Sequence, residues 1–142
     1  MTGLETLRAL LRGDLPPAGI GKTLDFRLVD VGDGWAVFEG GTGEHLYNPA
    51  QTVHGGYFAT LLDSALACAV MSKLPEGRTY TTVQLNVNLL RPATAATGTL
   101  RATANAVHVG RTIGTAEARL EGVDDGKLYA HATTTCAILP VR

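Results

Sequence analysis

Residues 55–74 limit the possible folds of this chain more than any other segment. Their large apolar side chains recur at the spacing of a helix, and most of the remaining positions hold Ala, Ser, Thr or Cys. A helix of this composition is apolar or small on nearly every side, so it belongs in the centre of a domain. We therefore expect one long, buried helix here, with Asp63 as the only charged residue between positions 57 and 72.

The segments before this helix predict one short helix and a hairpin. Leu side chains recur at helical spacing in residues 2–12, and Thr2 with Glu5 three residues later forms a capping-box pattern. Residues 22–31 and 35–39 are expected to form two strands, joined by a turn at Gly32-Asp33-Gly34. A loop rich in Gly, Asn and Pro is expected at 40–52.

After the helix, the hydrophobic pattern changes to a period of two, which is typical of strands. In residues 82–89, apolar side chains at the odd-numbered positions alternate with Thr, Gln and Asn. Three further strands are expected at about 98–109, 111–121 and 127–139, and Asp125-Gly126 is a typical hairpin turn. We predict an α+β fold, in which an antiparallel sheet of about six strands wraps around the long central helix. Residues 1–142 would form a single domain, with 1–20 as its N-terminal helix and linker.

Composition argues against several classes of protein. The 142 residues carry 12 Lys and Arg against 13 Asp and Glu, with no basic block, so nothing favours nucleic-acid binding. No apolar stretch reaches the length of a membrane span, and no secretory signal is visible. Cys68 and Cys136 are too few for a disulfide framework, and no Cys/His cluster suggests zinc. We expect reduced, buried thiols in a cytoplasmic protein that does not bind membranes.

Asp63 is the first candidate for chemistry. A carboxylate on a buried helix is unfavourable unless partners stabilise its charge. It could accept hydrogen bonds from hydroxyl groups and fix a subunit contact, or it could line a cleft as a general base or nucleophile. Its position alone does not decide between the structural and the catalytic interpretation.

The start of the long helix, Val53-His54-Gly55-Gly56, is the second candidate. Two glycines let a ligand approach the backbone, and the first turn of a helix presents free N–H groups at the positive end of its dipole. These groups would stabilise a carbonyl oxygen that gains negative charge. A Gly-Gly pair also occurs in plain turns, and His54 is expected to hydrogen-bond the loop and hold its shape.

The spacing of the two candidates suggests a site shared between chains. His54 and Asp63 are nine residues apart, so they lie on opposite faces of an ideal helix and about 13 Å apart along its axis. One chain does not easily bring both to a single reacting atom. If both serve one site, two copies build it, and a two-fold dimer with antiparallel central helices would form two equal sites.

Several motifs resemble those of the hotdog-fold acyl-CoA thioesterases, and in particular the PaaI-like group of the phenylacetate pathway. They are Asn-Pro-Ala-Gln-Thr-Val-His-Gly-Gly at 48–56, Thr-Leu-Leu-Asp at 60–63, Thr-Val-Gln-Leu-Asn-Val-Asn-Leu-Leu-Arg-Pro-Ala at 82–93 and Val-Gly-Arg at 109–111. The order of elements matches over roughly residues 20 to 140. The resemblance implies a hotdog fold and hydrolysis of an acyl-CoA to a carboxylic acid and coenzyme A.

The resemblance also implies a role for individual residues. Asn48 and the N–H of Gly55 would polarise the thioester carbonyl. Asp63 of the partner subunit would activate water or attack the carbonyl directly. Thr82 stands where the family often has a Ser or Thr that helps to position water, and His54 would support the loop that carries Asn48 and Gly55.

Further residues are candidates for substrate binding. Gly56 would allow close approach of the substrate, and Tyr57, Phe58 and Leu61 are candidates for the lining of the acyl pocket, although aromatic residues on a helix more often belong to the core. Arg91 and Arg111 would meet the phosphates of coenzyme A, which is part of the substrate. No metal or redox cofactor is needed. A homodimer would form the site, and a tetramer built as a dimer of dimers is expected.

Two other functions stay open at this point. A hotdog hydratase or dehydratase would pair a catalytic His with an acid across a dimer, as His54 and Asp63 could, although the Pro-Gly-rich approach to that family's helix is absent. A non-catalytic acyl-CoA-binding domain is the other alternative, since one fold hosts many functions. The acyl group is open as well. Aromatic and medium-chain groups both fit, and Ala67 stands where some aromatic-specific relatives carry a hydroxyl group.

Overall fold

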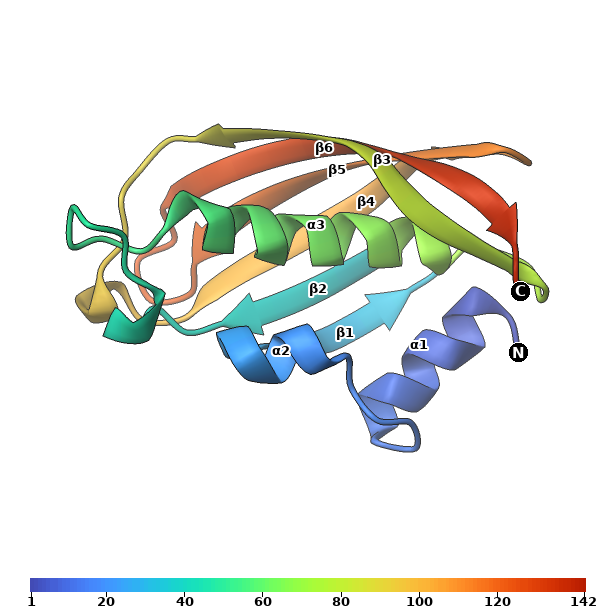
Figure 1. The fold of residues 1–142 in the computed structure, drawn as a ribbon, viewed down its shortest axis with the longest axis horizontal. Coiled ribbons are helices and arrows are strands. Elements are labelled where there is room, and N and C mark those ends of the chain that lie inside the picture. Colours follow the sequence, from blue (N-terminus) through green and yellow to red (C-terminus); the bar gives the residue numbers. More distant parts are fainter.

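One antiparallel sheet curves around one long helix in the computed structural model, which describes residues 1–142 (Figure 1). The helix is α3 (Gly55–Met71). The strands are β1 (Phe26–Gly32), β2 (Trp35–Gly40), β3 (Arg78–Leu89), β4 (Leu100–Val109), β5 (Ile113–Gly122) and β6 (Leu128–Pro140). Their order across the sheet is β1-β2-β4-β5-β6-β3, and all neighbours are antiparallel. The predicted α+β fold, a six-stranded sheet around a central helix, is confirmed.

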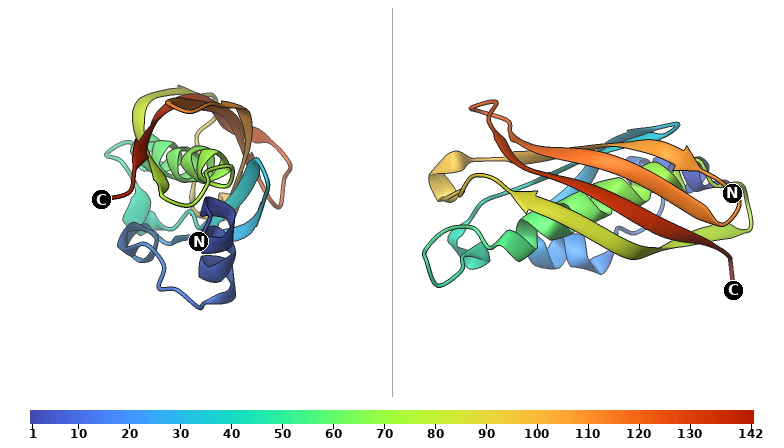
Figure 2. Two further views of the ribbon diagram at one scale, coloured as in Figure 1. Left: turned by 90° about the vertical axis from the view of Figure 1, so that its right-hand side faces the viewer. Right: turned by 90° about the horizontal axis from the view of Figure 1, so that it is seen from above.

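Helix α3 lies inside the curve of the sheet, as the end-on view shows (Figure 2, left), and forms the centre of the hydrophobic core. The sheet covers only part of its circumference. Gly56 is exposed, and Thr60, Asp63 and Ser64 are half-buried. These positions are three or four residues apart, so they share one face of the helix. The residues that point into the core are Tyr57, Phe58, Leu61, Leu62, Ala65, Leu66, Ala67, Ala69 and Val70.

Helix α1 (Gly3–Arg12) forms as the capping pattern predicts. The Thr2 hydroxyl accepts a 3.2 Å hydrogen bond from the Glu5 N–H, and the Glu5 carboxylate accepts one of 2.9 Å from the Thr2 N–H. Leu7 of this helix is buried against Val31 and Ala36 of the β1–β2 hairpin. Helix α1 therefore covers that hairpin and the end of α3.

The strand expected at 22–31 is wrong in its first part. Residues Gly19–Leu24 form a short helix, α2, and β1 begins only at Phe26. Thr23 has the β-branched side chain of a strand residue, but its hydroxyl donates to the Gly19 carbonyl one turn earlier. Asp25 then ends the helix with a left-handed backbone (φ 61°) and turns the chain into β1.

The strand around residues 82–89 is confirmed, but Val83 does not point inward. A β-bulge between Thr82 and Gln84 makes Val83 an extra residue in the pairing with β6. The bulge changes the alternation, so Val83 is 61% exposed while Leu85 packs against the core. Leu89, where the strand ends, is 56% exposed.

The remaining connections follow the prediction closely. The Asp33-Gly34 turn joins β1 to β2, with Gly34 at φ 85°. The hairpin at Asp125-Gly126 also forms, but its loop covers residues 123–127 rather than two residues. The 3₁₀ helices η1 (Glu44–Leu46) and η2 (Ala95–Thr97) lie in the loops before α3 and before β4.

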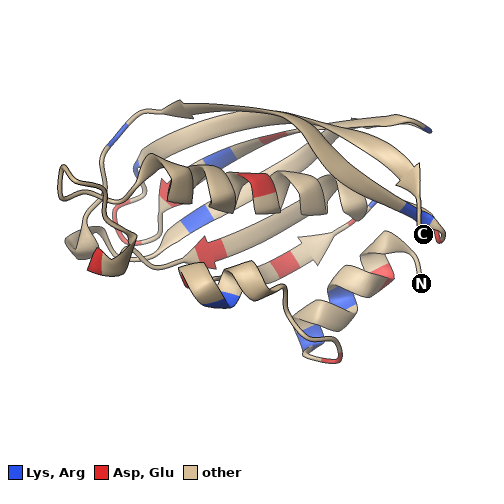
Figure 3. Cartoon of the chain, in the orientation of Figure 1, with Lys and Arg blue, Asp and Glu red and all other residues tan.

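Charged residues are scattered over the fold, with no concentration of one sign on the face in view (Figure 3). None of the helices is both long enough and apolar enough to cross a bilayer.

Candidate active site

The loop before helix α3 is closed by hydrogen bonds centred on Asn48. Its side-chain oxygen accepts bonds from the N–H groups of Ala50 (2.9 Å) and Thr52 (3.2 Å), and its Nδ2 donates to the Thr52 hydroxyl (3.1 Å). The Asn48 N–H also donates to the Thr52 carbonyl, and the Gln51 N–H donates to the Asn48 carbonyl. Gln51 takes a left-handed backbone (φ 67°) to make the turn. These contacts hold the Asn48 amide in one orientation. One hydrogen of its Nδ2 is left to donate elsewhere.

His54 is the N-cap of helix α3. Its Nδ1 accepts a 2.8 Å hydrogen bond from the Gly56 N–H, and its own N–H donates to the Leu46 carbonyl. The imidazole therefore fixes the first turn of the helix. The N–H of Gly55 donates no hydrogen bond within the chain, so it is free at the positive end of the helix.

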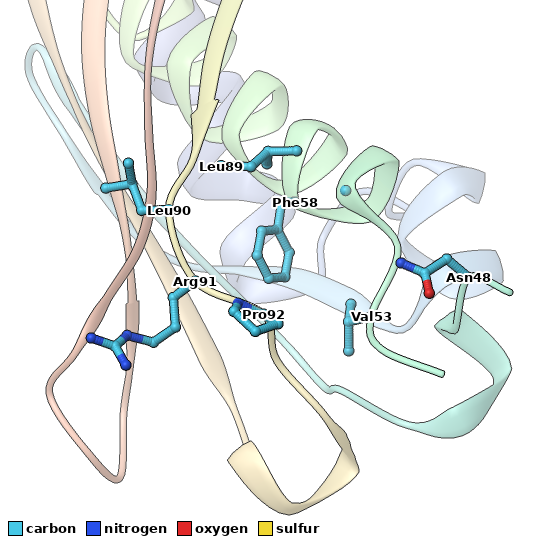
Figure 4. A pocket seen from close by; sticks show the side chains of 8 residues that line it. Asn48, Val53, Phe58, Leu89, Leu90, Arg91 and Pro92 are labelled. Atoms are coloured by element: carbon cyan, nitrogen blue, oxygen red, sulfur yellow. The ribbon is translucent and has the colours of Figure 1, made fainter. Parts of the chain in front are cut away.

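A pocket of about 240 Å³ lies where this loop meets the start of α3 and the end of β3 (Figure 4). Its walls bring together three of the predicted residues: Asn48, Gly55 and Arg91. The amide nitrogen of Asn48 lies on the side of Phe58 and α3, whereas Arg91 extends away from Asn48 (Figure 4). The other lining residues are Val53, Phe58, Leu89, Leu90 and Pro92.

Asp63 lies on the uncovered face of α3 and meets strand β3. The hydroxyl of Thr82 donates a 2.9 Å hydrogen bond to Asp63 Oδ1. No other group of the chain donates to this carboxylate, so Oδ2 is free to accept a proton or a water. The arrangement joins a predicted base and a predicted water-positioning hydroxyl within one protomer.

The negative charge of Asp63 influences the buried groups around it. Burial, and secondly this charge, raise the pKa of the Cys68 thiol to about 12. Burial is also the main reason why the pKa of Tyr80 is raised, and the negative charge of Asp63 adds to it. Both groups therefore stay protonated at neutral pH.

Two predicted binding residues lie apart from the pocket. Tyr57 is 4% exposed, and its hydroxyl donates to the Asp25 carbonyl on the side of β1. It belongs to the core, whereas its neighbour Phe58 lines the pocket. Gly56 is exposed, but its N–H is taken by His54, so only the Gly55 N–H is available to a ligand here.

Arg111 lies in a different place from Arg91. It lines a second pocket, of about 440 Å³, together with Lys73 and Arg78. The Arg78 guanidinium donates a 2.9 Å hydrogen bond to the Arg111 carbonyl and so ties the start of β3 to the β4–β5 turn. The two arginines that the sequence assigned to one ligand are therefore not brought together within one chain.

The predicted catalytic residues thus form two groups within one chain. Asn48, His54 and Gly55 lie at the start of α3, and Asp63 with Thr82 lies near its middle. Gly55 and Asp63 are separated by eight residues, or about 12 Å along the helix axis. No group of three or more His, Cys, Asp or Glu side chains is placed to hold a metal ion.

Comparison with known proteins identifies the family. Residues 50–129 match the family model of the thioesterase superfamily. The chain belongs to this superfamily. A provisionally named esterase of Halobacterium salinarum is 38% identical over 124 residues, which are 82% of this chain and 80% of the relative. The predicted recognition as a thioesterase is confirmed, and with it a hydrolase activity.

Solved structures of this superfamily share the fold. A Ralstonia eutropha protein, provisionally described as a thioesterase and related to phenylacetic acid degradation, is 32% identical with a TM-score of 0.82. The match covers 92% of this chain and 97% of that one. The Escherichia coli PaaI protein, from the phenylacetic acid degradation operon, is 24% identical with a TM-score of 0.81, over 96% and 93% of the two chains. The thioesterase is thus PaaI-like, with a hotdog fold.

The sequence did not reveal some residues that shape the site. Thr52 fixes the Asn48 amide, and the only signal for this is its position four residues later. Lys73 and Arg78 share the second pocket with Arg111, but they come from a different part of the chain and no spacing rule links them. Cys136 pairs with Thr82, and Thr134 bonds the Gln84 carbonyl, but both look like ordinary residues of a buried strand in the sequence.

Proposed function

We propose that this thioesterase hydrolyses acyl-CoA, giving a free acid and coenzyme A, with Asp63 as general base or nucleophile. The observation that supports this proposal most is the position of Asp63 and its hydrogen bonding. It is the only charged side chain on a core helix, it lies on the uncovered face, and Thr82 is its one partner in the chain. A carboxylate kept half-buried with one free oxygen suits a reacting group better than a structural one.

The start of α3 supplies the other half of the chemistry. When water or Asp63 attacks the thioester carbonyl, its oxygen becomes negatively charged. The free Gly55 N–H and the remaining hydrogen of Asn48 Nδ2 would donate to that oxygen, and the thiolate of coenzyme A would leave. His54 would act through the backbone, since its Nδ1 is engaged by Gly56.

Two protomers would complete each site. Asp63 lies about 12 Å along the helix from Gly55, and the face of α3 that carries Asp63 is the face the sheet leaves open. Strand β3, next to it, is an edge strand with exposed Val83 and Leu89, and the exposed Leu90 follows directly after it. A second copy packed here with α3 antiparallel would place its Asp63 beside this copy's Gly55. We expect a homodimer, and a dimer of dimers as the tetramer.

Substrate recognition would involve both pockets. The apolar lining of the first pocket would hold the acyl group near Asn48 and Gly55. Arg91 and Arg111, being far apart in one chain, would contact coenzyme A phosphates from different protomers or at different points of the molecule. Aromatic and medium-chain acyl groups both remain candidates. The proposal requires no metal or redox cofactor and places the enzyme in the cytoplasm.

The test is release of free coenzyme A from a panel of aromatic and straight-chain acyl-CoAs. Wild type should release the thiol, and Asp63→Asn should lower kcat at least about 100-fold while keeping its assembly state, because general-base catalysis contributes that much or more. Glu117→Gln removes an exposed acid from the outer face of β5 and serves as the matched control. Full activity of Asp63→Asn would refute the assigned role.

A further inference from the structure

The β-bulge in strand β3 aims Thr82 at Asp63. Without it, strict alternation would turn every second residue after Thr82 toward the core, starting with Gln84. The bulge inserts Val83 as an extra, exposed residue, so that Thr82 and Leu85 both point inward. Bulges re-aim side chains in this way, and they are common beside active sites.

Two buried residues of the neighbouring strand β6 support this bulge. Thr134 is 4% exposed, and its hydroxyl donates a 2.9 Å hydrogen bond to the Gln84 carbonyl, at the end of the bulge. Cys136 is fully buried and pairs directly with Thr82 across the two strands. Burial raises the pKa of the Cys136 thiol, while interactions with the hydroxyls of Thr82 and Thr134 oppose this shift. Thr134 therefore binds the end of the bulge, whereas Thr82, which pairs with Cys136, lies at its start and reaches Asp63.

We propose that Thr134 is a positioning residue for the reaction: its bond to the bulge orients the Thr82 hydroxyl toward Asp63. The inference rests on the proposed function, in which Asp63 reacts. Thr134 does not reach the substrate or the carboxylate itself. Its effect passes through the backbone of residues 82–84 and the contact between Thr82 and Cys136.

Two variants of Thr134 distinguish an effect on the orientation of Thr82 from an effect on the stability of the protein. Thr134→Val keeps the shape of the side chain and removes the hydroxyl, and Thr134→Ser keeps the hydroxyl. Thr42 offers the control, because it is 3% exposed and its hydroxyl donates a 2.8 Å bond to the Gly98 carbonyl, away from Asp63. Thr42→Val and Thr134→Val should lower Tm by similar amounts, since each loses one buried hydrogen bond.

Of the two Thr→Val variants, only the one at Thr134, beside the bulge, should lower kcat. Well below Tm, Thr134→Val should lower kcat about tenfold, the order of one misaligned hydrogen bond to a charged group, with KM almost unchanged. Thr134→Ser should stay near wild type, and Thr42→Val should keep the wild-type kcat. In a Thr82→Val background, Thr134→Val should lower kcat no further, because its target is already gone.

A crystal structure of Thr134→Val separates failure of this inference from failure of the proposed function. We expect the contact between the Thr82 hydroxyl and Asp63 to be lost, whether or not the protein hydrolyses acyl-CoA. An unchanged contact, or a wild-type kcat in an active enzyme, would overturn the role of Thr134. Lack of hydrolysis by wild type would instead refute the proposed function, and the crystal structure would still decide the geometry.

Discussion

The hydroxyl of Thr82 donates a 2.9 Å hydrogen bond to Asp63 Oδ1 and joins the edge strand β3 to the middle of helix α3. The bond fixes one oxygen of the carboxylate and leaves the other free. A reacting carboxylate held in this way presents a single oxygen in a defined direction, which general-base and nucleophilic roles both require.

Removing this hydroxyl should impair catalysis more than folding. We expect Thr82→Val to lower kcat about tenfold or more, because the carboxylate loses its one fixed partner. Thr82→Ser should retain most activity. Steady-state kinetics on the best acyl-CoA substrate measures both, with circular dichroism to confirm the fold. Equal activity of the Val and Ser variants would remove Thr82 from the site.

A site shared by two protomers predicts complementation between inactive variants. Asn48→Ala and Asp63→Asn each damage every site of their own homodimer. In a mixed dimer, one site combines both intact residues. Co-expression should therefore restore about a quarter of wild-type activity, since half of the dimers are mixed and each has one good site.

The matched control for complementation combines Asp63→Asn with Thr82→Val. Asp63 and Thr82 come from the same protomer in each site. Every site of a mixed dimer therefore lacks one of the two residues, and activity should stay low. No recovery in the first mixture would place the whole site within one chain. Recovery in this control would show instead that Thr82 and Asp63 serve different sites.

Gly55 is predicted to matter for the space it leaves as well as for its N–H group. A Cβ at this position would lie 2.6 Å from Leu89 Cδ1, at the wall of the first pocket. Gly55→Ala should therefore lower kcat/KM about tenfold, or about 1.4 kcal/mol, because the added methyl group and the displaced Leu89 side chain narrow the pocket. Gly19→Ala is the control, since nothing lies within 4 Å of its Cβ. Wild-type kinetics for Gly55→Ala would exclude a substrate at this wall.

Arg91 and Arg111 should recognise the nucleotide part of the substrate. Arg91→Met and Arg111→Met should each raise KM for acyl-CoA several-fold, roughly the loss of one charge-assisted contact. Neither should change KM for the acyl-pantetheine, which lacks the nucleotide. Arg119→Met, on the exposed part of β5, should change neither value. Equal effects on both substrates would show that the arginines shape the pocket instead.

The two cysteines should be inert in the folded protein. The pKa of Cys68 is raised to about 12 and that of Cys136 is raised as well, against about 8.5 for an unfolded thiol. Because the folded state favours the neutral thiols, their contribution to stability is complete below about pH 8.5 and is lost as the pH rises toward 12. Native protein should not react with a thiol reagent at pH 8, and urea midpoints should fall at pH 10. Rapid labelling of the native protein would contradict the first expectation.

Patterns that depend on neighbouring residues predicted most of the fold. The capping box of α1 and the apolar composition of α3 are local signals, and both elements form as expected. The bulge at Val83 had no such signal. It is stabilised by Thr134, 51 residues further along the chain, and a strict alternation therefore pointed Val83 inward.

In the candidate site, too, local patterns predicted some features but not the contacts between distant segments. The helical spacing of His54 and Asp63 correctly indicated two separate groups, because the geometry of a helix is known in advance. The separation of Arg91 from Arg111 depends on how β3 and the β4–β5 turn are placed in the sheet, which no local pattern specifies. Tyr57 faces β1 rather than the pocket for a similar reason, since Asp25 offers its carbonyl there.

The exposed edge of strand β3 also affects how a newly made chain assembles. It is the last strand of the sheet, 12 residues long, and it carries no proline. A bare edge of this kind is a template onto which any extended segment can add. A newly made chain can therefore pair this edge either with a second folded copy or with another unfolded chain, and aggregation should compete with assembly more strongly as the concentration of newly made chains rises.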